Sequence, residues 1–435
     1  MKRTGRSFAF IAFIASLTII WSCTGSPGRN SYQNPVLGGD YPDPSVIRVG
    51  NDFFMTHSSF NYYPGLLVWH STDLIHWERI SHALHKNVGS VWAPDLVKYG
   101  DTWYIYFPAG GTNWVVTASS PEGPWSEPVD LNLRGFIDPG HLTGPDGKRY
   151  LYLSKGFIIQ LSDDGLSTVG EPKFNYAGWV FPKEWSTECF CLESPKSTVK
   201  DGYYYITVAE GGTAGPATSH MIVSARSESP FGPFENSPFN PVVHTGSREE
   251  RWWSQGHGTL VDDIEGNWWI MYHGYEKNFH TLGRQTLMLP VEWTKEKWFR
   301  VPEKIKSSDE INIPSGKKSH DGTGLSDDFS GEKIGLQWQF YKKFSPERIT
   351  LSEGTIKLSS EGGSFDDSSP LLVNSSDRKY EIQVEYTIDE GVTAGLCLYY
   401  NETANMRISV DRERFTVFIQ KNAKIREANK LGNHG

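Results

Sequence analysis

The stretch Gly100-Asp101-Thr102-Trp103-Tyr104-Ile105-Tyr106 joins a turn to an aromatic strand. Gly and Asp favour the turn, and alternating aromatic residues favour a strand. The same design recurs as Gly50–Met55, Gly147–Tyr152, Asp201–Ile206 and Gly266–Tyr272. The copies begin about 47 to 65 residues apart, roughly the length of a four-stranded propeller blade with its loops. The repeat therefore predicts an all-β protein whose residues 31–302 form a five-bladed β-propeller.

The overall composition agrees with many short strands joined by turns. Aromatic residues make up 14% of the 435 residues, and the chain contains 43 Gly and 25 Pro. The formal net charge is −9, and the charges are spread along the chain rather than gathered in runs. Because no basic stripe is present to neutralise phosphates, we expect no nucleic-acid partner.

One ionisable residue stands about 8 to 12 residues before each aromatic pair of the repeat. The five residues are Asp43, Asp95, Asp138, Glu193 and His257. In a propeller the innermost strand of each blade lines the axis, and the aromatic strand is the next one outward. The five side chains are therefore expected to meet at the mouth of one channel. Carboxylates brought together in this way repel one another, which a fold tolerates mainly where chemistry needs them.

The N-terminus has the features of a secretion signal. Lys2, Arg3 and Arg6 precede an apolar run, Phe8–Ile20, which at about 13 residues is too short to span a membrane. The following Ile20-Trp21-Ser22-Cys23 resembles the lipobox of bacterial lipoproteins. We therefore expect residues 1–23 to be a lipoprotein signal peptide, Cys23 to be lipidated, and the mature protein to be held at the bacterial cell envelope, on its periplasmic or cell-surface side.

Three further cysteines follow, Cys189, Cys191 and Cys397. On a strand, Cys189 and Cys191 would share one face, a spacing poorly suited to a relaxed disulfide. Further Cys or His ligands for zinc are lacking. We interpret these cysteines as small buried residues.

The composition changes after Pro302. Residues 303–324 are polar and lack aromatics, as a linker does, and residues 325–435 are expected to form a second β-domain. In this part Tyr380–Asp389 alternates apolar and polar residues, which predicts a strand with one wet face. Arg414–Lys421 repeats that pattern, and Lys424–Gly435 has none.

The segments that lead the blades resemble glycoside hydrolase family 43. They are Asn34–Leu37 with Tyr41–Ser45, Trp92–Asp95, Ile137–Pro139, Glu193–Lys196 with Ala209–Thr213, Gly256–Gly258 and Leu282–Thr286. The family usually has Glu-Gly-Pro-His at the fourth landmark, so Ser194 and Lys196 are departures. The segments Asp327–Phe329 and Leu336–Phe340 resemble the concanavalin-like β-sandwich (jelly roll) attached to exo-acting members, although that domain is usually longer than what remains here.

The resemblance implies roles for three carboxylates. Asp43 would be the general base that activates water, and Glu193 the general acid that protonates the departing oxygen. Asp138 would raise the pKa of the acid and orient it. Such a division needs one carboxyl protonated and another ionised near neutral pH. Glu188 and Glu210 remain nearby alternatives for the acid.

The resemblance also implies residues that contact the sugar. His257 and Arg284 correspond to subsite residues near the axis, and some family members hold a calcium ion or a water at the axial His. No cofactor is otherwise expected. Asp95 is expected at the channel wall as a substrate-binding residue. The indoles of Trp92, Trp252 and Trp253 could stack on a sugar ring or pack between blades.

The expected activity is that of an inverting, exo-acting glycosidase that releases terminal pentoses from hemicellulose oligosaccharides. The sequence leaves open whether the sugar is β-D-xylose or α-L-arabinofuranose. Two alternatives remain: an endo-acting arabinanase, which usually lacks the appended sandwich, and a non-catalytic carbohydrate-binding lipoprotein of the cell surface.

Overall fold

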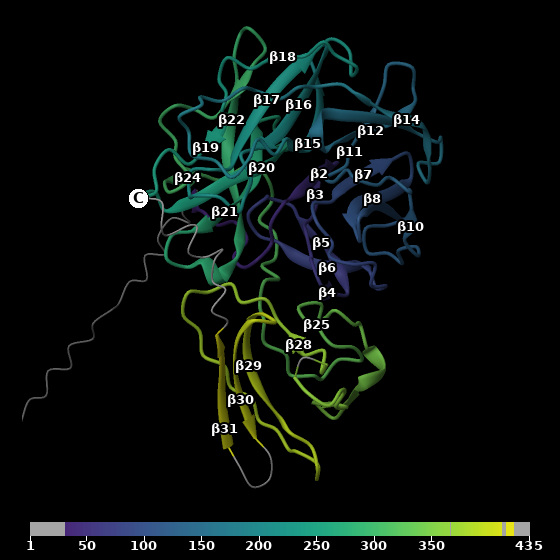
Figure 1. Ribbon diagram of the computed structural model, residues 1–435, viewed down its shortest axis with the longest axis vertical. Coiled ribbons are helices and arrows are strands. Elements are labelled where there is room, and N and C mark those ends of the chain that lie inside the picture. The colour runs from purple at the N-terminus through teal and green to yellow at the C-terminus, as the bar shows by residue number, and fades with distance from the viewer. Residues whose placement is uncertain (1–30, 366, 411–414, 422–435) are drawn as a thin grey trace, which may run out of the picture.

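A computed structural model describes residues 31–365, 367–410 and 415–421 (Figure 1). Nearly all regular structure in them is β-strand, as the repeat predicts. The helical segments of these residues are three short 3-10 turns, Ser154–Gly156, His280–Leu282 and Pro346–Arg348. None of the helices in this part of the chain is long and apolar enough to cross a membrane. Cys23 and the tail 424–435 lie outside the described residues.

Five successive sheets of antiparallel strands make up the larger part of the molecule. In each sheet the strands follow one another outward from the first. The first sheet contains β2 (Ser45–Val49), β3 (Asp52–Thr56), β5 (Gly65–Ser71) and β6 (Glu78–Leu84). The second contains β7 (Asp95–Tyr99), β8 (Thr102–Ala109), β9 (Thr112–Ala118) and β10 (Val129–Asp130). The third contains β11 (Gly140–Thr143), β12 (Arg149–Leu153), β13 (Phe157–Leu161) and β14 (Thr168–Phe174).

The fourth and fifth sheets continue the series. The fourth contains β15 (Glu193–Lys200), β16 (Tyr203–Glu210), β17 (Met221–Ser227) and β18 (Glu235–Asn236), and β19 (Val243–His244) also pairs with β17. The fifth contains β20 (Trp252–Asp262), β21 (Trp268–Glu276), β22 (Arg284–Trp293) and β23 (Phe299–Arg300). The five aromatic repeats are the second strands β3, β8, β12, β16 and β21, as predicted.

The first strands of the five sheets close a ring. β2 contacts β7, β7 contacts β11, β11 contacts β15, β15 contacts β20, and β20 returns to β2. This is the arrangement of a β-propeller, in which the first strand of each blade lines the axis. The ring brings residues at the starts of these strands to one place although they are far apart in sequence.

Aromatic side chains fill the spaces between the blades. Phe53, Tyr152 and Tyr205, from three of the repeat strands, are almost completely buried. A buried aromatic side chain removes about 150–250 Å² from water, and apolar area contributes about 25 cal/mol per Å². The repeat is therefore conspicuous in the sequence because its aromatic residues stabilise the packing of one blade on the next.

The segment after the propeller runs back along its side. β24 (Glu310–Asn312), which falls inside the expected linker, pairs with β1 (Ser31–Gln33). Further along, the backbone oxygens of Gly322 and Gly324 accept hydrogen bonds from Arg79. This polar segment is therefore bound to the propeller along its length.

The second region lies below the propeller in Figure 1 and shares a small sheet with it. β25 (Gln339–Tyr341) pairs with β4 (Tyr62–Tyr63) of the propeller and with β28 (Leu371–Leu372). β26 (Ile349–Ser352) and β27 (Thr355–Leu358) form a hairpin. β29 (Ala394–Asn401), β30 (Ala404–Val410) and β31 (Phe415–Lys421) form a three-stranded sheet, which confirms the strand expected near the C-terminus.

The strand predicted over residues 380–389 is wrong. These residues are not in a strand, and no described strand pairs with them. Tyr380, Ile382, Val384 and Tyr386 are each about half exposed, so neither face of the segment is covered. Alternation alone does not make a strand, because a strand also requires a neighbour that accepts and donates its backbone hydrogen bonds.

Candidate functional site

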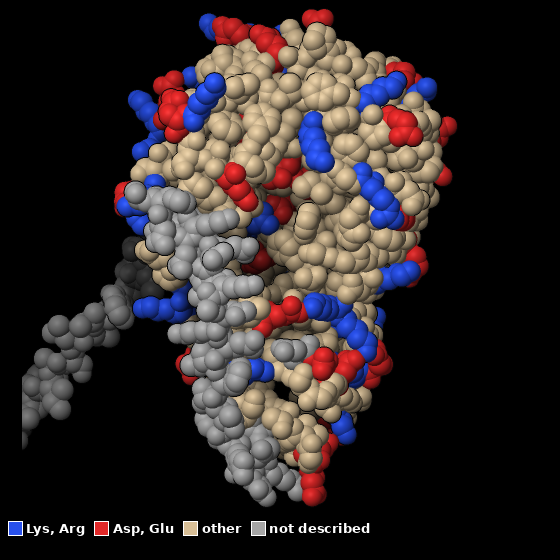
Figure 2. All heavy atoms as spheres, viewed as in Figure 1, with Lys and Arg blue, Asp and Glu red and all other residues tan. Residues whose placement is uncertain are grey.

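Four of the five predicted ionisable residues meet at the axis of the propeller. Asp43 and Asp138 each stand two residues before a first strand, Glu193 opens β15, and His257 lies within β20. His257 Nδ1 is 3.3 Å from Asp43 Oδ1, and its Nε2 is 3.6 Å from Asp138 Oδ2. A Glu193 carboxylate oxygen, one His257 nitrogen and one His220 nitrogen lie within 4.8 Å of one another. Figure 2 shows acidic atoms recessed in a hollow near the middle of the propeller.

The backbone at this site is unusual. Asp43, Asp138 and His257 have φ values of 60°, 55° and 63°, in the left-handed region that non-glycine residues seldom adopt. The pairing of β20 with β21 shifts register on both sides of Gly256, next to His257. Such irregularities re-aim a side chain, and local strain of this kind gathers at functional sites.

Asp43 is the most heavily contacted carboxylate of the site. Arg284 Nη1 donates to its Oδ1 at 2.8 Å, and Ser58 Oγ donates to its Oδ2 at 2.5 Å. His273 Nδ1 lies 2.9 Å from the same Oδ1. Burial by itself raises the pKa of Asp43, but Arg284, His257 and His273 together hold that pKa well below its ordinary value. Asp43 is therefore ionised at neutral pH.

Asp138 and Glu193 have the opposite electrostatics. Burial raises the pKa of Asp138 to about 7, with the nearby charge of Asp43 adding to the effect. Burial, followed by the charges of Asp138 and Asp43, raises the pKa of Glu193 well above its ordinary value. The two groups repel one another as anions, so the pair keeps a proton near neutral pH. One site thus holds an ionised carboxylate beside a protonated one.

Three imidazoles form the floor of the site, His220, His257 and His273. Burial lowers the pKa of His257 to about 3 and that of His273 to about 4, so both rings are neutral at pH 7. The calcium ion that some family members hold at the axial His is poorly matched by the donors near His257. Calcium takes six to eight oxygen ligands, whereas the groups close to His257 include two imidazoles and a carboxylate already paired with Arg284.

Asp95, the fifth predicted residue, has a different role. Lys196 Nζ binds its Oδ1 at 2.7 Å, and the backbone N–H of His141 donates to its Oδ2 at 2.7 Å. Asp95 is 7% exposed and both of its oxygens are engaged. Through these contacts Asp95 braces β7 against β15, and its contact with the sugar stays a prediction. The pair gives a structural role to Lys196, which departs from the usual motif of the family.

Lys196→Met is expected to lower the free energy of unfolding by about 3–5 kcal/mol, because Asp95 becomes a buried charge without its partner. Lys200, on the same strand, pairs with Asp201 at 3.1 Å near the surface. Lys200→Met is therefore a matched control and should cost about 1 kcal/mol or less. Denaturant unfolding of both variants measures the difference, and equal losses would show that the Asp95–Lys196 pair has no special importance.

The other departure, Ser194, occupies a position suited to glycine. Its φ is 55°, and its buried hydroxyl has no hydrogen-bond partner. Its backbone N–H donates to Asp138 Oδ2 at 3.2 Å. Asp138 is thereby tied to the residue that follows Glu193.

The three tryptophans predicted to stack on a sugar or to pack between blades differ in their exposure. Trp252 is 1% exposed in the core, so it packs between blades and cannot meet a ligand. Trp253 is half-buried, and its Nε1 donates to the backbone oxygens of Arg248 and Glu250. Trp92 is 46% exposed and precedes the first strand β7, where its indole can stack on a ring. Phe60, which the sequence analysis missed, lies under the Arg284 guanidinium.

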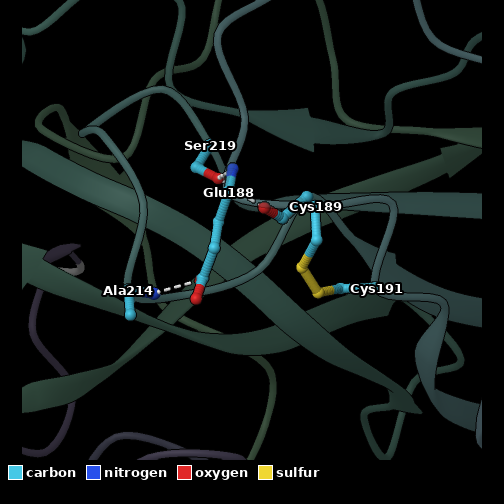
Figure 3. The surroundings of a disulfide bond; sticks show 6 residues. Glu188, Cys189, Cys191, Ala214 and Ser219 are labelled. Atoms are coloured by element: carbon cyan, nitrogen blue, oxygen red, sulfur yellow. Dashed lines mark hydrogen bonds between the residues drawn. A yellow bond between two sulfur atoms is a disulfide. The ribbon is translucent and has the colours of Figure 1, made fainter. Parts of the chain in front are cut away.

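The interpretation of the paired cysteines is wrong. Cys189 and Cys191 form a disulfide, with their Cα atoms 5.3 Å apart, and both are half-buried in a loop before β15 (Figure 3). The expectation failed because it assumed a strand, whereas Cys191 has a φ of 42° and turns the chain. The neighbouring Glu188 is held by Ser219 Oγ, which accepts its N–H, and by the N–H of Ala214. The loop that leads into Glu193 is therefore fixed at several points.

The two alternative candidates for the general acid, Glu188 and Glu210, have surroundings that differ from those of Glu193. Glu188 is exposed, and its carboxylate accepts the hydrogen bond from Ala214. Burial raises the pKa of Glu210 to about 8, but its Oε1 accepts the N–H of Trp179, and neither Asp43 nor Asp138 contributes to the shift. Glu193 is the candidate acid that is coupled to both carboxylates at the axis.

The sequence did not indicate four residues of this site: Ser58, Phe60, His220 and His273. His273 follows the fifth aromatic repeat directly, so its position on that strand was an available signal. Ser58 and His220 stand in segments without any recognisable pattern.

Both parts of the chain match known protein families. Residues 32–299 match Glycosyl hydrolases family 43, and residues 326–431 match the Beta xylosidase C-terminal Concanavalin A-like domain. A relative from Bacteroides ovatus, named non-reducing end alpha-L-arabinofuranosidase BoGH43B, is 32% identical over 372 residues, covering 78% of this chain and 67% of the relative. The xylan 1,3-beta-xylosidase of a Vibrio species is 30% identical over 424 residues, covering 85% of this chain and 77% of that protein.

Among solved structures, the GH43 protein BlXynB from Bacillus licheniformis is similar, with 29% sequence identity and a TM-score of 0.78. The likeness covers 89% of this chain and 81% of that one. The family match includes all the residues described at the axis. By fold, site and sequence, this chain belongs to glycoside hydrolase family 43, and it is a glycosidase.

Proposed function

We propose that the protein is an inverting, exo-acting glycosidase that releases terminal β-D-xylose or α-L-arabinofuranose from hemicellulose oligosaccharides. The observation that supports this most directly is the opposite electrostatics of two carboxylates at one site. The pKa of Asp43 is lowered, and that of Glu193 is raised. The relatives' names include both xylosidases and arabinofuranosidases, so the sugar is the part of the proposal that most needs an experiment.

In this proposal Asp43 acts as the general base. It is ionised, and Arg284 and Ser58 fix both of its oxygens. It takes a proton from a water molecule, whose oxygen forms a bond to the anomeric carbon. Glu193 gives its proton to the glycosidic oxygen as the bond from that oxygen to the anomeric carbon breaks. Inversion follows because water attacks from the face opposite the leaving group.

Asp138 supports the acid in two ways. Its nearby charge contributes to the raised pKa of Glu193, which keeps the acid protonated until it is needed. It also accepts the Ser194 N–H, which restrains the backbone beside Glu193. Asp138 needs no contact with the reacting atoms for either effect.

Around the reacting carboxylates, Arg284, His257 and Trp92 are the proposed sugar contacts. Arg284 uses Nη1 for Asp43, which leaves other N–H groups of its planar fork for hydroxyls. His257 is neutral and has no conventional hydrogen-bond partner for its ring nitrogens. The exposed face of Trp92 offers an apolar surface to a ring.

Purified protein incubated with nitrophenyl β-xyloside, nitrophenyl α-arabinofuranoside and linear arabinan is the test of this function. We expect nitrophenol release from at least one pentoside and only monosaccharide from oligosaccharides. Internal cleavage of arabinan to short oligomers would instead identify an endo-acting enzyme. Binding to polysaccharide without release of any sugar would show a carbohydrate-binding protein.

We also propose that the protein is a lipoprotein of the bacterial cell envelope, anchored through Cys23. The support is the short apolar run Phe8–Ile20, followed by the lipobox-like Ile20-Trp21-Ser22-Cys23. Cys23→Ala is expected to move the protein from the membrane fraction to the soluble fraction, as immunoblots of fractionated cells would show. Cys397→Ala is the matched control and should leave the distribution unchanged. If Cys23→Ala also remains with the membranes, the anchoring proposal is wrong.

A further inference from the structure

A short segment of the second region, residues 374–378, contacts the propeller next to Asp43. The side-chain amide of Asn374 makes two hydrogen bonds to the backbone of Asp40. Its Oδ1 accepts the Asp40 N–H at 3.2 Å, and its Nδ2 donates to the Asp40 carbonyl oxygen at 3.1 Å. The Asn374 side chain thus bonds both the N–H and the carbonyl oxygen of Asp40, as a neighbouring β-strand would.

Glycines let the two backbones approach closely. A Cβ on Gly38 would lie 2.9 Å from the backbone oxygen of Ser376, and one on Gly39 would lie 3.1 Å from that of Ser375. Gly38 has no positive φ, so its small size matters here for space alone. A third glycine, Gly283, faces the Asp40 side chain, which a Cβ would approach to 2.3 Å.

The side chain of Asp40 links this contact to Arg284 and Asp43 at the site. Its Oδ1 accepts the backbone N–H of Arg284 at 3.0 Å, and Arg284 Nη1 donates to Asp43 at 2.8 Å. Asp43 itself is only three residues beyond Asp40. The loop held by Asn374 therefore carries one partner of the Arg284–Asp43 ion pair and fixes the other.

A second link ties the same segment to the strand beside Arg284. Arg378 forms a two-bond ion pair with Glu276, whose side chain is 5% exposed. Glu276 ends β21, and its neighbour Tyr275 is paired with Arg284 across β21 and β22. Beside these contacts lies a cavity of about 700 Å³, lined by Leu37, Gly38, Tyr41, Asn374 and Arg378 among others. Polar links, rather than dense packing, therefore hold this side of the loop.

We infer that Asn374 is a positioning residue for the reaction: by holding the Asp40 loop, the second region keeps Arg284 against Asp43. The inference rests on the proposed role of Asp43 as the base. It assigns the second region a part in the chemistry of the propeller site, through a residue that touches neither substrate nor reacting atoms.

Loss of the contact between Asn374 and Asp40 is expected to change the pH dependence of kcat/KM. Arg284 is the strongest of the groups that lower the pKa of Asp43. The others that lower it are His257 and His273, and the nearby acids are Asp40, Asp138 and Glu193. If Arg284 moves away, the pKa of Asp43 rises, and the base is lost at a higher pH than before. The acidic limb of kcat/KM should then move upward by about one pH unit. A loss of folded protein that is the same at every pH would lower the rate without moving that limb.

The experiment compares Asn374→Ala with Asn401→Ala, an exposed asparagine of the second region whose side chain bonds within its own turn. We expect the acidic limb to shift in Asn374→Ala and to stay in place in Asn401→Ala. Gly38→Ala separates the same two backbones from the propeller side and should shift the limb in the same direction. Gly38→Ala therefore provides the test of the pH dependence if Asn374→Ala folds poorly. If Asn374→Ala and Gly38→Ala both fold well and keep the acidic limb of kcat/KM at the wild-type pH, the inference is wrong.

Amide hydrogen exchange provides a readout that does not depend on activity. The N–H groups of Asp40 and Arg284 should exchange faster in Asn374→Ala than in the wild type or in Asn401→Ala. If the wild type releases no pentose, the proposed function fails, and exchange at these two amides still decides whether Asn374 holds the loop. Unchanged exchange would reject the positioning role whatever the activity.

Discussion

Glu193→Ala is expected to slow the hydrolysis of natural pentose oligosaccharides by about 10²–10⁴ while affecting nitrophenyl pentosides far less. A sugar alkoxide is a poor leaving group and needs the proton that Glu193 supplies. A nitrophenolate departs readily without one. Rates of wild type and variant on an oligosaccharide and on the matching nitrophenyl pentoside measure the difference.

Glu188→Gln is the control for this experiment, because Glu188 is a nearby exposed carboxylate and the amide keeps an oxygen for the Ala214 N–H. Its rates on both substrates should match the wild type. If Glu193→Ala slows both substrates equally, the residue is not the proton donor. Glu210, whose pKa burial raises to about 8, would then be the next carboxylate to test.

Asp43→Ala is expected to reduce the rates on both substrate types together, again by about 10²–10⁴. Both reactions need an activated water, whatever the leaving group. Added azide should restore part of the activity, because the anion attacks the anomeric carbon with no proton to lose. The product is then a glycosyl azide of inverted configuration, which mass spectrometry and NMR identify.

The azide effect should be specific to loss of the base. In Glu193→Ala the base is intact, so azide should leave hydrolysis of the oligosaccharide slow, since the leaving alkoxide still lacks a proton. A loss confined to one substrate type in Asp43→Ala, or absence of any glycosyl azide, would contradict the role of Asp43.

The sequence was sufficient to predict the propeller and four ionisable residues at its axis, for one physical reason. Each blade is a local meander, so its turn and its aromatic second strand leave a signal within about ten residues. The position of one ionisable residue relative to that signal then indicates which side chains start the first strands. Asp43, Asp138, Glu193 and His257 were found in this way.

Contacts between distant segments were not predictable from such local signals. The Asp95–Lys196 pair joins two blades that are far apart in sequence, and only the structure shows it. The disulfide was missed because its geometry depends on the turn at Cys191, for which the sequence gives no glycine or proline. The predicted strand near residue 384 had the right alternation but lacks a partner among the described strands.

The anomeric configuration of the first sugar released shows whether Asp43 and Glu193 act as base and acid on opposite faces of one bond. Proton NMR spectra taken at early times distinguish the two anomers before mutarotation mixes them. We expect the released pentose to appear first with the configuration opposite to that of the bond cleaved. A sugar released with the original configuration would contradict it, because retention requires a covalent intermediate on a carboxylate instead of direct attack by water.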